Sequence, residues 1–125
     1  MRILIVEDSY SLADTLQTAL KNENYIVDAV FDGSDGYEYG RTGIYDIIIL
    51  DYQMDKIDGL ETARQLRNGI NEFACIIFLT NYGEISIDAY SVDTYRFVLK
   101  STLWDGLYNA LDDYRKRMNT GKSIS

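Results

Sequence analysis

Four short, largely apolar runs in this chain are each followed directly by polar residues. The runs occupy residues 3–6, 47–50, 75–79 and 95–99. The polar residues that follow them are Glu7 with Asp8, Asp51, Thr80 and Lys100. If the runs are parallel strands of one sheet, these side chains share one edge, where ligands bind in such sheets. Three carboxylates, a hydroxyl and an ammonium could hold a divalent cation and a phosphoryl group there, with one acid left as nucleophile.

The three acids are suited to Mg²⁺, which takes near-octahedral oxygen ligands and uses one or two protein carboxylates plus waters. A backbone carbonyl near Gln53 could add a ligand. Lys100 offers a positive charge and Thr80 a hydroxyl to a phosphoryl group. Asp51 is the natural nucleophile, because an aspartyl phosphate is a known covalent intermediate. Each residue alone could merely cap a turn or be solvated; their register across four runs favours a functional site.

The composition limits the chemistry of this site. The chain has 125 residues, no histidine, and 20 acids against 12 bases, for a net charge of −8. Without histidine, metal ligands must be oxygens, which favours Mg²⁺ or Mn²⁺ over Zn²⁺. The acidic charge argues against direct binding of nucleic acid or of anionic membranes. The one cysteine, Cys75, lies in an apolar run and is expected to be a buried small hydrophobe rather than a nucleophile.

No feature of the sequence indicates export or membrane insertion. The first apolar run is far too short for a signal peptide, and no apolar stretch approaches the roughly 20 residues that span a bilayer. A single cysteine allows no disulfide framework within the chain, which fits a reducing compartment. We therefore expect a cytoplasmic protein.

The periodicity alternates between strand-like and helix-like segments. Strands are predicted at 2–6, 25–31, 45–50, 73–79 and 94–99. Helices are predicted at 10–23, 34–43, from 59 with an apolar stripe to Ile70, at 84–91 and at 102–118, with Ser9 or Ser11 capping the first. Five βα units predict a doubly wound α/β domain with helices on both faces of a five-stranded parallel sheet in the flavodoxin-like order 2-1-3-4-5. Residues 1–118 form this domain, and 119–125 a polar tail or the start of a linker.

Together these motifs resemble the receiver domain of two-component response regulators, over about residues 2–118. They comprise the first run with its paired acids, Asp51 with Met54 and Asp58-Gly59 downstream, Leu79-Thr80, and Val98-Leu99-Lys100. The resemblance implies that Asp51 accepts a phosphoryl group from a phosphohistidine of a sensor histidine kinase. It implies that Mg²⁺ is bound by Glu7, Asp8, Asp51 and the Gln53 backbone carbonyl, and that Thr80 and Lys100 contact the phosphoryl oxygens.

The resemblance also implies a conformational switch. Thr80 and an aromatic residue, here Phe97, act together, and the surface of the fourth helix, fifth strand and fifth helix is read by an attached or partner effector. Such a domain promotes its own phosphorylation and dephosphorylation but is not an ordinary turnover enzyme. A chain without histidine can accept a phosphoryl group from phosphohistidine but cannot donate one from it.

The chain departs from the family pattern at three positions. It contains no proline, so the usual Lys-Pro pair is Lys100-Ser101, for which a trans peptide bond is expected, or a strained cis bond, because a non-proline cis bond costs roughly 2.5–4 kcal/mol. The usual proline after Met54 is Asp55. The residue after the switch threonine is Asn81 rather than a small residue, and its amide could narrow access to the phosphoryl site.

The segment 89–100 resembles receivers that are attached to LytTR-type DNA-binding domains, which would make the chain part of a transcription regulator. A stand-alone receiver fits the sequence equally well. Eleven tyrosines are many for this length. Most are expected to pack at the core boundary, but Tyr90, Tyr95 and Tyr108 lie on or near the output surface and could support a homodimer.

Three alternatives stay open at this point. A haloacid-dehalogenase-type phosphotransferase would need a second aspartate where Gln53 stands. A flavodoxin-like cofactor binder would need a phosphate loop where Glu7 and Asp8 would repel a phosphate. A degenerate receiver that only binds partners is disfavoured by the complete set of Asp51, Thr80 and Lys100.

Overall fold

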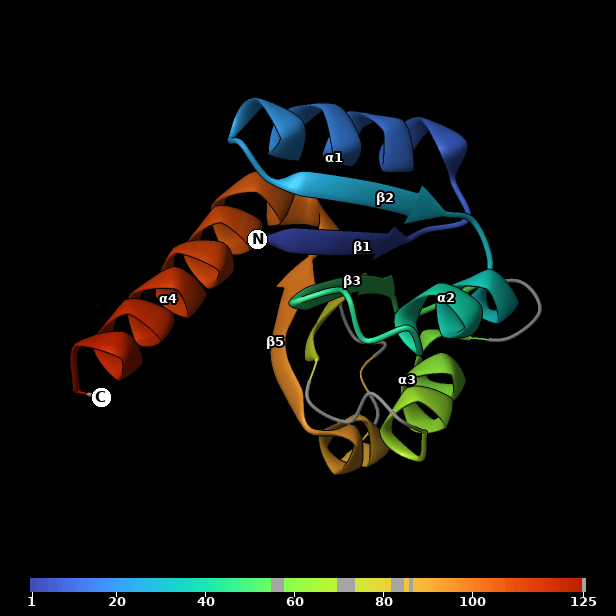
Figure 1. The fold of residues 1–125 in the computed structure, drawn as a ribbon. Helices are drawn as coiled ribbons and strands as arrows, with labels where there is room; N and C mark the ends of the chain where they lie inside the picture. The colour runs from blue at the N-terminus through green and yellow to red at the C-terminus, as the bar shows by residue number, and fades with distance from the viewer. Residues whose placement is uncertain (55–57, 70–73, 82–84, 86, 125) are drawn as a thin grey trace.

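The computed structural model describes residues 1–54, 58–69, 74–81, 85 and 87–124. Its centre is one five-stranded parallel sheet in the order β2-β1-β3-β4-β5 (Figure 1). The strands are β1 Arg2–Val6, β2 Ile26–Val30, β3 Ile47–Asp51, β4 Cys75–Thr80 and β5 Thr94–Leu99. The predicted fold class and strand order are confirmed.

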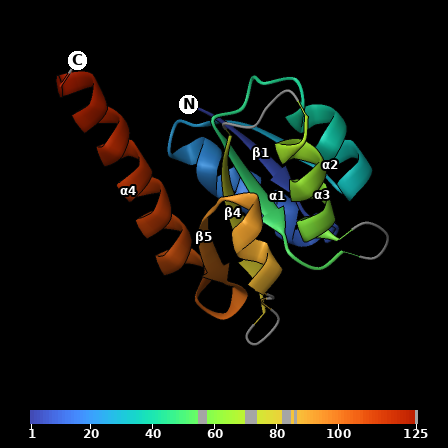
Figure 2. The same ribbon diagram turned by 90° about the horizontal axis from the view of Figure 1, so that it is seen from below.

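Helices cover both faces of the sheet, as Figures 1 and 2 show. They are α1 Tyr10–Asn22, α2 Gly33–Gly40, α3 Gly59–Arg67 and α4 Leu103–Ile124, with short 3-10 helices η1 Ile87–Val92 and η2 Lys100–Thr102. α1 and α4 pack on one face, and α2, α3 and η1 on the other. None of the helices in the described part combines the length and the apolar character needed to cross a bilayer.

The central strands β1 and β3 are buried on both faces, which explains their unbroken apolar runs. Ile3 and Ile5 point into the core beneath α1 and α4, whereas Leu4 and Val6 point into the core beneath α2 and α3. All four side chains are fully buried. Alternate residues of one strand therefore serve two separate cores, as in a doubly wound sheet.

The register of the sheet aligns the strand ends. Val6 pairs with Leu50, Asp51 with Leu79, and Thr80 with Leu99. The polar residues that end β3 and β4 or follow β1 and β5 consequently meet at one edge of the sheet, as the sequence predicts.

Local side-chain bonds fix the helix starts at this edge. The Ser9 hydroxyl accepts from the Leu12 backbone N–H at 3.3 Å, so Ser9 rather than Ser11 caps α1. Asp58 caps α3 by accepting from the Glu61 backbone N–H at 2.8 Å. These caps satisfy backbone N–H groups that a helix start leaves without partners.

Two segments differ from the predicted helices. The short helix predicted at 84–91 is the 3-10 helix η1 at Ile87–Val92, and residues 84 and 86 lie outside the described residues. Side chains compete there for backbone carbonyls: Ser91 donates to Asp88 at 2.6 Å and Thr94 donates to Ala89 at 2.8 Å. α4 runs to Ile124 rather than ending at residue 118, because extending an existing helix requires no new nucleus. That residues 119–125 begin a linker stays a prediction, and Ile70 and Asp55 lie outside the described residues.

Two further expectations concern single residues. The Lys100–Ser101 peptide bond is trans, since the described backbone contains no cis peptide. Cys75 is half-buried rather than fully buried. Burial nevertheless raises the pKa of its thiol to about 12. Because the thiolate is the reactive form, Cys75 is a poor nucleophile, in line with the prediction.

Candidate functional site

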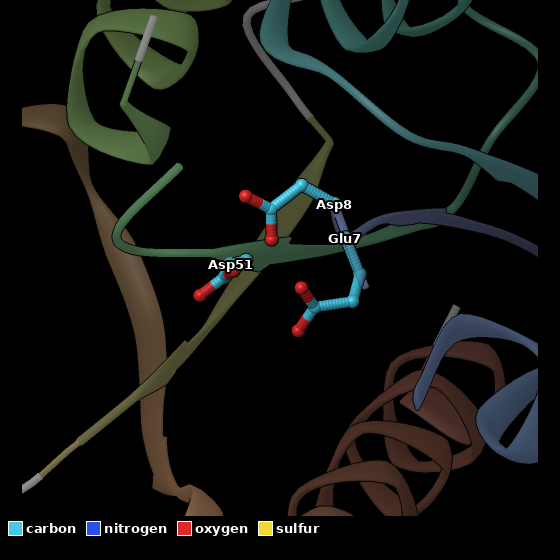
Figure 3. Close-up of side chains that lie close together, drawn as sticks. All are labelled: Glu7, Asp8 and Asp51. Carbon is cyan, nitrogen blue, oxygen red and sulfur yellow. The ribbon is translucent and has the colours of Figure 1, made fainter. Parts of the chain in front are cut away.

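Three carboxylates converge at the edge of the sheet where β1 and β3 end (Figure 3). Glu7 and Asp8 follow β1 directly, and Asp51 is the last residue of β3. One carboxylate oxygen from each lies within 4.8 Å of the other two. Glu7 and Asp51 are buried, with exposed fractions of 0% and 2%, whereas Asp8 is partly exposed. The cluster therefore opens to solvent on the side of Asp8.

Lys100 supplies a positive charge to this cluster from the end of β5. Its Nζ atom lies 3.0 Å from Asp51 Oδ1 and 3.4 Å from Glu7 Oε1. Burial lowers the pKa of the Lys100 ammonium, but the hydrogen bond and charge of Asp51 outweigh it, and the net shift is upward. Lys100 is therefore charged at neutral pH and faces both buried acids.

The pKa of Glu7 is raised to about 8, first by burial and then by its hydrogen bond to Asp51. The Ser9 backbone N–H donates to Glu7 Oε2 at 3.1 Å and partly opposes this shift. Two buried acids sharing one site cannot both ionise without cost. Glu7 therefore tends to hold a proton in the absence of a cation.

Two buried oxygen atoms of the cluster have no hydrogen-bond partner among the described residues: Asp51 Oδ2 and Glu7 Oε1. Glu7 Oε1 lies 3.4 Å from Lys100 Nζ but without hydrogen-bond geometry. Buried carboxylate oxygens without hydrogen bonds are costly, and a bound cation would satisfy them. The donor set, made of carboxylate oxygens alone, fits a hard divalent cation such as Mg²⁺.

The other predicted site residues lie around the cluster in different settings. Thr80 ends β4, is buried, and donates its hydroxyl to the Asn81 carbonyl at 3.0 Å. Asn81 and Gln53 are exposed. Gln53 lies two residues beyond Asp51, in the loop that leaves β3. Thr80 is thus at the correct edge, but its bond in this structure is to its own neighbour.

Phe97 lies away from the acids, in an aromatic group on the α3 side of the sheet. Its ring stacks on Phe78 with centroids 5.8 Å apart and meets Tyr90 edge-on at 5.5 Å. Phe78 precedes Thr80 by two residues on β4, and Tyr90 belongs to η1. Phe97 therefore connects the strand that carries Thr80 with a surface element.

Gly59 has a role at the site that the sequence motif alone does not explain. A Cβ atom at Gly59 would lie 2.1 Å from the backbone oxygen of Asp51, so no other residue fits without displacement. The Gly59 N–H donates to the Tyr52 carbonyl at 3.0 Å, and the Tyr52 N–H donates to Leu79 at 2.8 Å. The start of α3 is thus pressed against the backbone that carries Asp51.

Sequence reasoning missed Arg67, the last residue of α3. Within the described part of the chain its guanidinium donates to the backbone carbonyls of Ala74, Val92 and Asp93, and the last two are more than 20 residues away. The only sequence signal is a charged residue adjoining the apolar stripe of a helix, which ordinarily indicates an exposed side chain.

Comparison with known proteins identifies the family. Residues 3–112 match the model of the response regulator receiver domain, and the chain belongs to this family. The haloacid-dehalogenase-type and flavodoxin-like alternatives are therefore wrong.

Two curated relatives are similar over most of the chain. The transcriptional regulatory protein DltR of Streptococcus agalactiae is 45% identical over 80 residues, covering 64% of this chain and 35% of DltR. The response regulator ArlR of Staphylococcus saprophyticus is 39% identical over 98 residues, covering 75% of this chain and 44% of ArlR. The chain thus spans less than half the length of these relatives.

Solved structures show the same fold. The response regulator TrrA of Thermotoga maritima, in complex with Mg(2+)-BeF, is 31% identical with a TM-score of 0.79, covering 90% of this chain and 96% of TrrA. TrrA in complex with the histidine kinase ThkA matches at 30% identity with a TM-score of 0.78 and the same coverage. The chain is therefore the receiver domain of a response regulator, in a family whose members include transcriptional regulators.

Proposed function

We propose that Asp51 is the phosphoryl acceptor of this receiver domain. The observation that carries the proposal is the Asp51 carboxylate, held 3.0 Å from Lys100 beside two further acids. An Asp51 oxygen attacks the phosphorus of a phosphohistidine. The P–O bond forms as the P–N bond breaks, and the electron pair of that bond leaves with the imidazole, which takes up a proton. Each domain accepts one phosphoryl group, so the protein is a signalling switch rather than a turnover enzyme.

The residues proposed to hold Mg²⁺, or Mn²⁺ in its place, are Glu7, Asp8, Asp51 and the backbone carbonyl of Gln53. Asp51 Oδ2 and Glu7 Oε1, the two buried oxygens without a hydrogen bond among the described residues, support this assignment. A bound divalent cation would neutralise charge on the acids and on the incoming phosphoryl group. The TrrA structure with Mg(2+)-BeF supports the choice of metal for a protein of this family.

Lys100 and Thr80 are proposed to bind the phosphoryl oxygens once Asp51 is modified. Lys100 already faces Asp51. Thr80 would exchange its bond to the Asn81 carbonyl for a bond to the phosphoryl group, because a hydroxyl gains more from an ionised acceptor. Phe97 would then repack against Phe78 and Tyr90, and the two-state equilibrium of the domain would shift.

The relatives support the proposed donor and output. The complex of TrrA with ThkA supports a sensor histidine kinase as donor. DltR, a transcriptional regulatory protein, supports an attached or partner effector that acts on transcription, and the LytTR subtype stays a prediction. A net charge of −8 argues against direct nucleic-acid or membrane binding by this domain. We also propose a cytoplasmic location, for which the single cysteine is the support.

We propose that the output surface consists of η1, β5 and α4, and that it can form a homodimer. Tyr90 on η1 is 66% exposed, and Tyr108 on α4 is 38% exposed and stacks on Trp104. Exposed aromatic residues are enriched among the residues that dominate binding energy. Unchanged phosphorylation-dependent dimerisation in Tyr90→Ala and Tyr108→Ala, followed by sedimentation, would rule out this role for the two tyrosines.

The test of the acceptor is the intact mass of the protein after incubation with acetyl phosphate and Mg²⁺, beside Asp51→Asn. A gain of about 80 Da, one phosphoryl group, in the parent alone is the expected result. An equal gain in mass in both proteins would mean that the acceptor is a residue other than Asp51. No gain in the parent, together with no Mg²⁺ binding, would favour the degenerate receiver that only binds partners.

A further inference from the structure

Arg67 joins three separate segments of the chain through one guanidinium group. Its Nε donates to the Val92 carbonyl at 2.7 Å, its Nη1 to Ala74 at 2.8 Å, and its Nη2 to Asp93 at 2.9 Å. The first and last of these carbonyls belong to the turn between η1 and β5, and Ala74 precedes β4. The planar guanidinium group of arginine has N–H donors in fixed directions and can bond to several carbonyls at once. The ammonium group of lysine cannot fix the same geometry.

The guanidinium is half-buried, and burial lowers its pKa despite the nearby charge of Asp93. A desolvated cation depends on its hydrogen bonds, and bonds from a charged donor are stronger than neutral ones. Breaking this contact would leave a half-buried charge without these acceptors. The three bonds therefore tie α3 to the η1–β5 turn.

The other end of α3 is fixed to the phosphoacceptor strand. Gly59 lies against the Asp51 backbone oxygen and donates to Tyr52, and Asp58 caps the helix. α3 therefore spans nine residues, about 13 Å at 1.5 Å per residue, from the Asp51 backbone to Arg67. Figures 1 and 2 both show α3 beside η1, against which it packs.

The turn that receives Arg67 controls how η1 is held on β5. Asp93 has a φ of 54°, a left-handed conformation that few non-glycine residues adopt, and Arg67 donates to the carbonyls of both Val92 and Asp93. η1 carries Tyr90, whose ring contacts Phe97 on β5. A displacement of this turn would therefore move the η1–β5 surface.

We propose that Arg67 is a positioning residue through which α3 transmits movement of the Asp51 backbone to the η1–β5 turn. This route runs beside the one through Thr80 and Phe97, and shares with it only the start at Asp51 and the end at η1 and β5. The inference rests on the proposed function, because it requires phosphorylation of Asp51. It assigns Arg67 to signal output and not to phosphoryl transfer itself.

The test compares amide hydrogen exchange over residues 87–97 with and without acetyl phosphate and Mg²⁺, in the parent and in Arg67→Met. The parent is expected to show a phosphorylation-dependent change. In Arg67→Met the change should fall at least about threefold, within the range of measured coupling contributions, while the mass gain at Asp51 persists. A merely structural role would alter exchange equally in both states and leave the difference intact.

Two further variants complete the experiment. Arg67→Lys keeps the positive charge but loses the planar guanidinium, so it should reduce the exchange difference as Arg67→Met does. It also replaces Arg67→Met in the test if that variant does not fold. Arg64→Ala is the matched control: Arg64 lies on the same helix and pairs with Asp88 of η1 at 3.7 Å, but the pair is exposed and contributes little. An undiminished change in both Arg67 variants, or no change in the phosphorylated parent, would overturn the inference. A parent that gains no mass would overturn the proposed function, and the inference with it.

Discussion

Lys100 reaches Asp51 across an intervening strand. The two residues belong to the ends of β5 and β3, which are separated by β4, and yet Lys100 Nζ lies 3.0 Å from Asp51 Oδ1. A long, flexible side chain is needed to cover this distance. The ammonium contacts both buried acids, so its position depends on the whole edge of the sheet.

Replacement of Lys100 by alanine should slow phosphorylation of Asp51 by about 100-fold, the usual cost of removing one pre-positioned charged donor from a transferring group. The rate of mass gain with acetyl phosphate measures this. Lys116→Ala is the control, because Lys116 is an exposed lysine whose pair with Asp112 lies on the surface of α4. Equal slowing in both variants would argue for a general charge effect.

Glu7 should make the metal-free protein less stable as the pH rises. Its pKa is about 8 in the folded protein against an ordinary value of 4.5, so between these values the folded state holds a proton that the unfolded state has lost. The free energy of unfolding therefore falls as pH rises through this window and levels off above it. Denaturant titrations in a chelator at several pH values should show this fall, and Glu7→Gln should lack it.

Mg²⁺ should counteract that loss, because the cation competes with the proton on Glu7. Its apparent affinity is therefore expected to increase from pH 6 to pH 8.5. A pH-independent affinity in the parent would contradict the assignment of Glu7 as a ligand. The same titration on Asp51→Asn provides a comparison with one acid fewer.

Gly59→Ala should destabilise the fold by roughly 3 kcal/mol, because the new Cβ atom would collide with the Asp51 backbone rather than with a mobile side chain. Gly43→Ala is the contrast. Gly43 has a φ of 79°, and a Cβ atom added there would have no neighbouring atom within 4 Å. The expected cost is therefore only about 1 kcal/mol of backbone strain. Thermal unfolding of both variants measures the difference, and similar losses would mean that α3 can shift away from β3.

Asn81→Ala should shorten the lifetime of the phosphoaspartate. Asn81 follows Thr80 directly and is exposed, so removal of its amide should widen the path of water to the phosphoryl group. A change by a factor of about 5, or roughly 1 kcal/mol in the barrier, is expected. Asn68→Ala, an exposed asparagine at the end of α3, is the control. Indistinguishable dephosphorylation rates for the parent and Asn81→Ala would contradict the prediction.

The sheet and the acid cluster could be predicted because their signals are local. A strand buried on both faces needs an unbroken apolar run, and the first polar residue after it marks the edge of the sheet, as Asp51 does after residues 47–50. When all strands are parallel and all crossovers are right-handed, only a few strand orders are possible in the sheet. The positions of Asp51, Glu7 and Lys100 relative to one another therefore follow from strand ends alone.

The contacts of Arg67 and Gly59 could not be predicted in the same way. Arg67 contacts carbonyls that are distant in sequence, and Gly59 lies against a backbone oxygen. Neither contact produces a periodic pattern in the sequence. The length of α4 and the 3-10 form of η1 depend on small differences between competing backbone hydrogen bonds.

The order of the strands along the chain has a consequence for biosynthesis. Glu7 and Asp51 precede Lys100 along the chain and become neighbours once β1 and β3 pair, whereas Lys100 leaves the ribosome about 50 residues after Asp51 at roughly 5–20 residues per second. Any pairing of β1 with β3 during these seconds would place the two acids side by side before the Lys100 ammonium can neutralise them. A proton on Glu7 or a captured divalent cation would relieve this repulsion, so Mg²⁺ present during translation would act on folding before it acts on signalling.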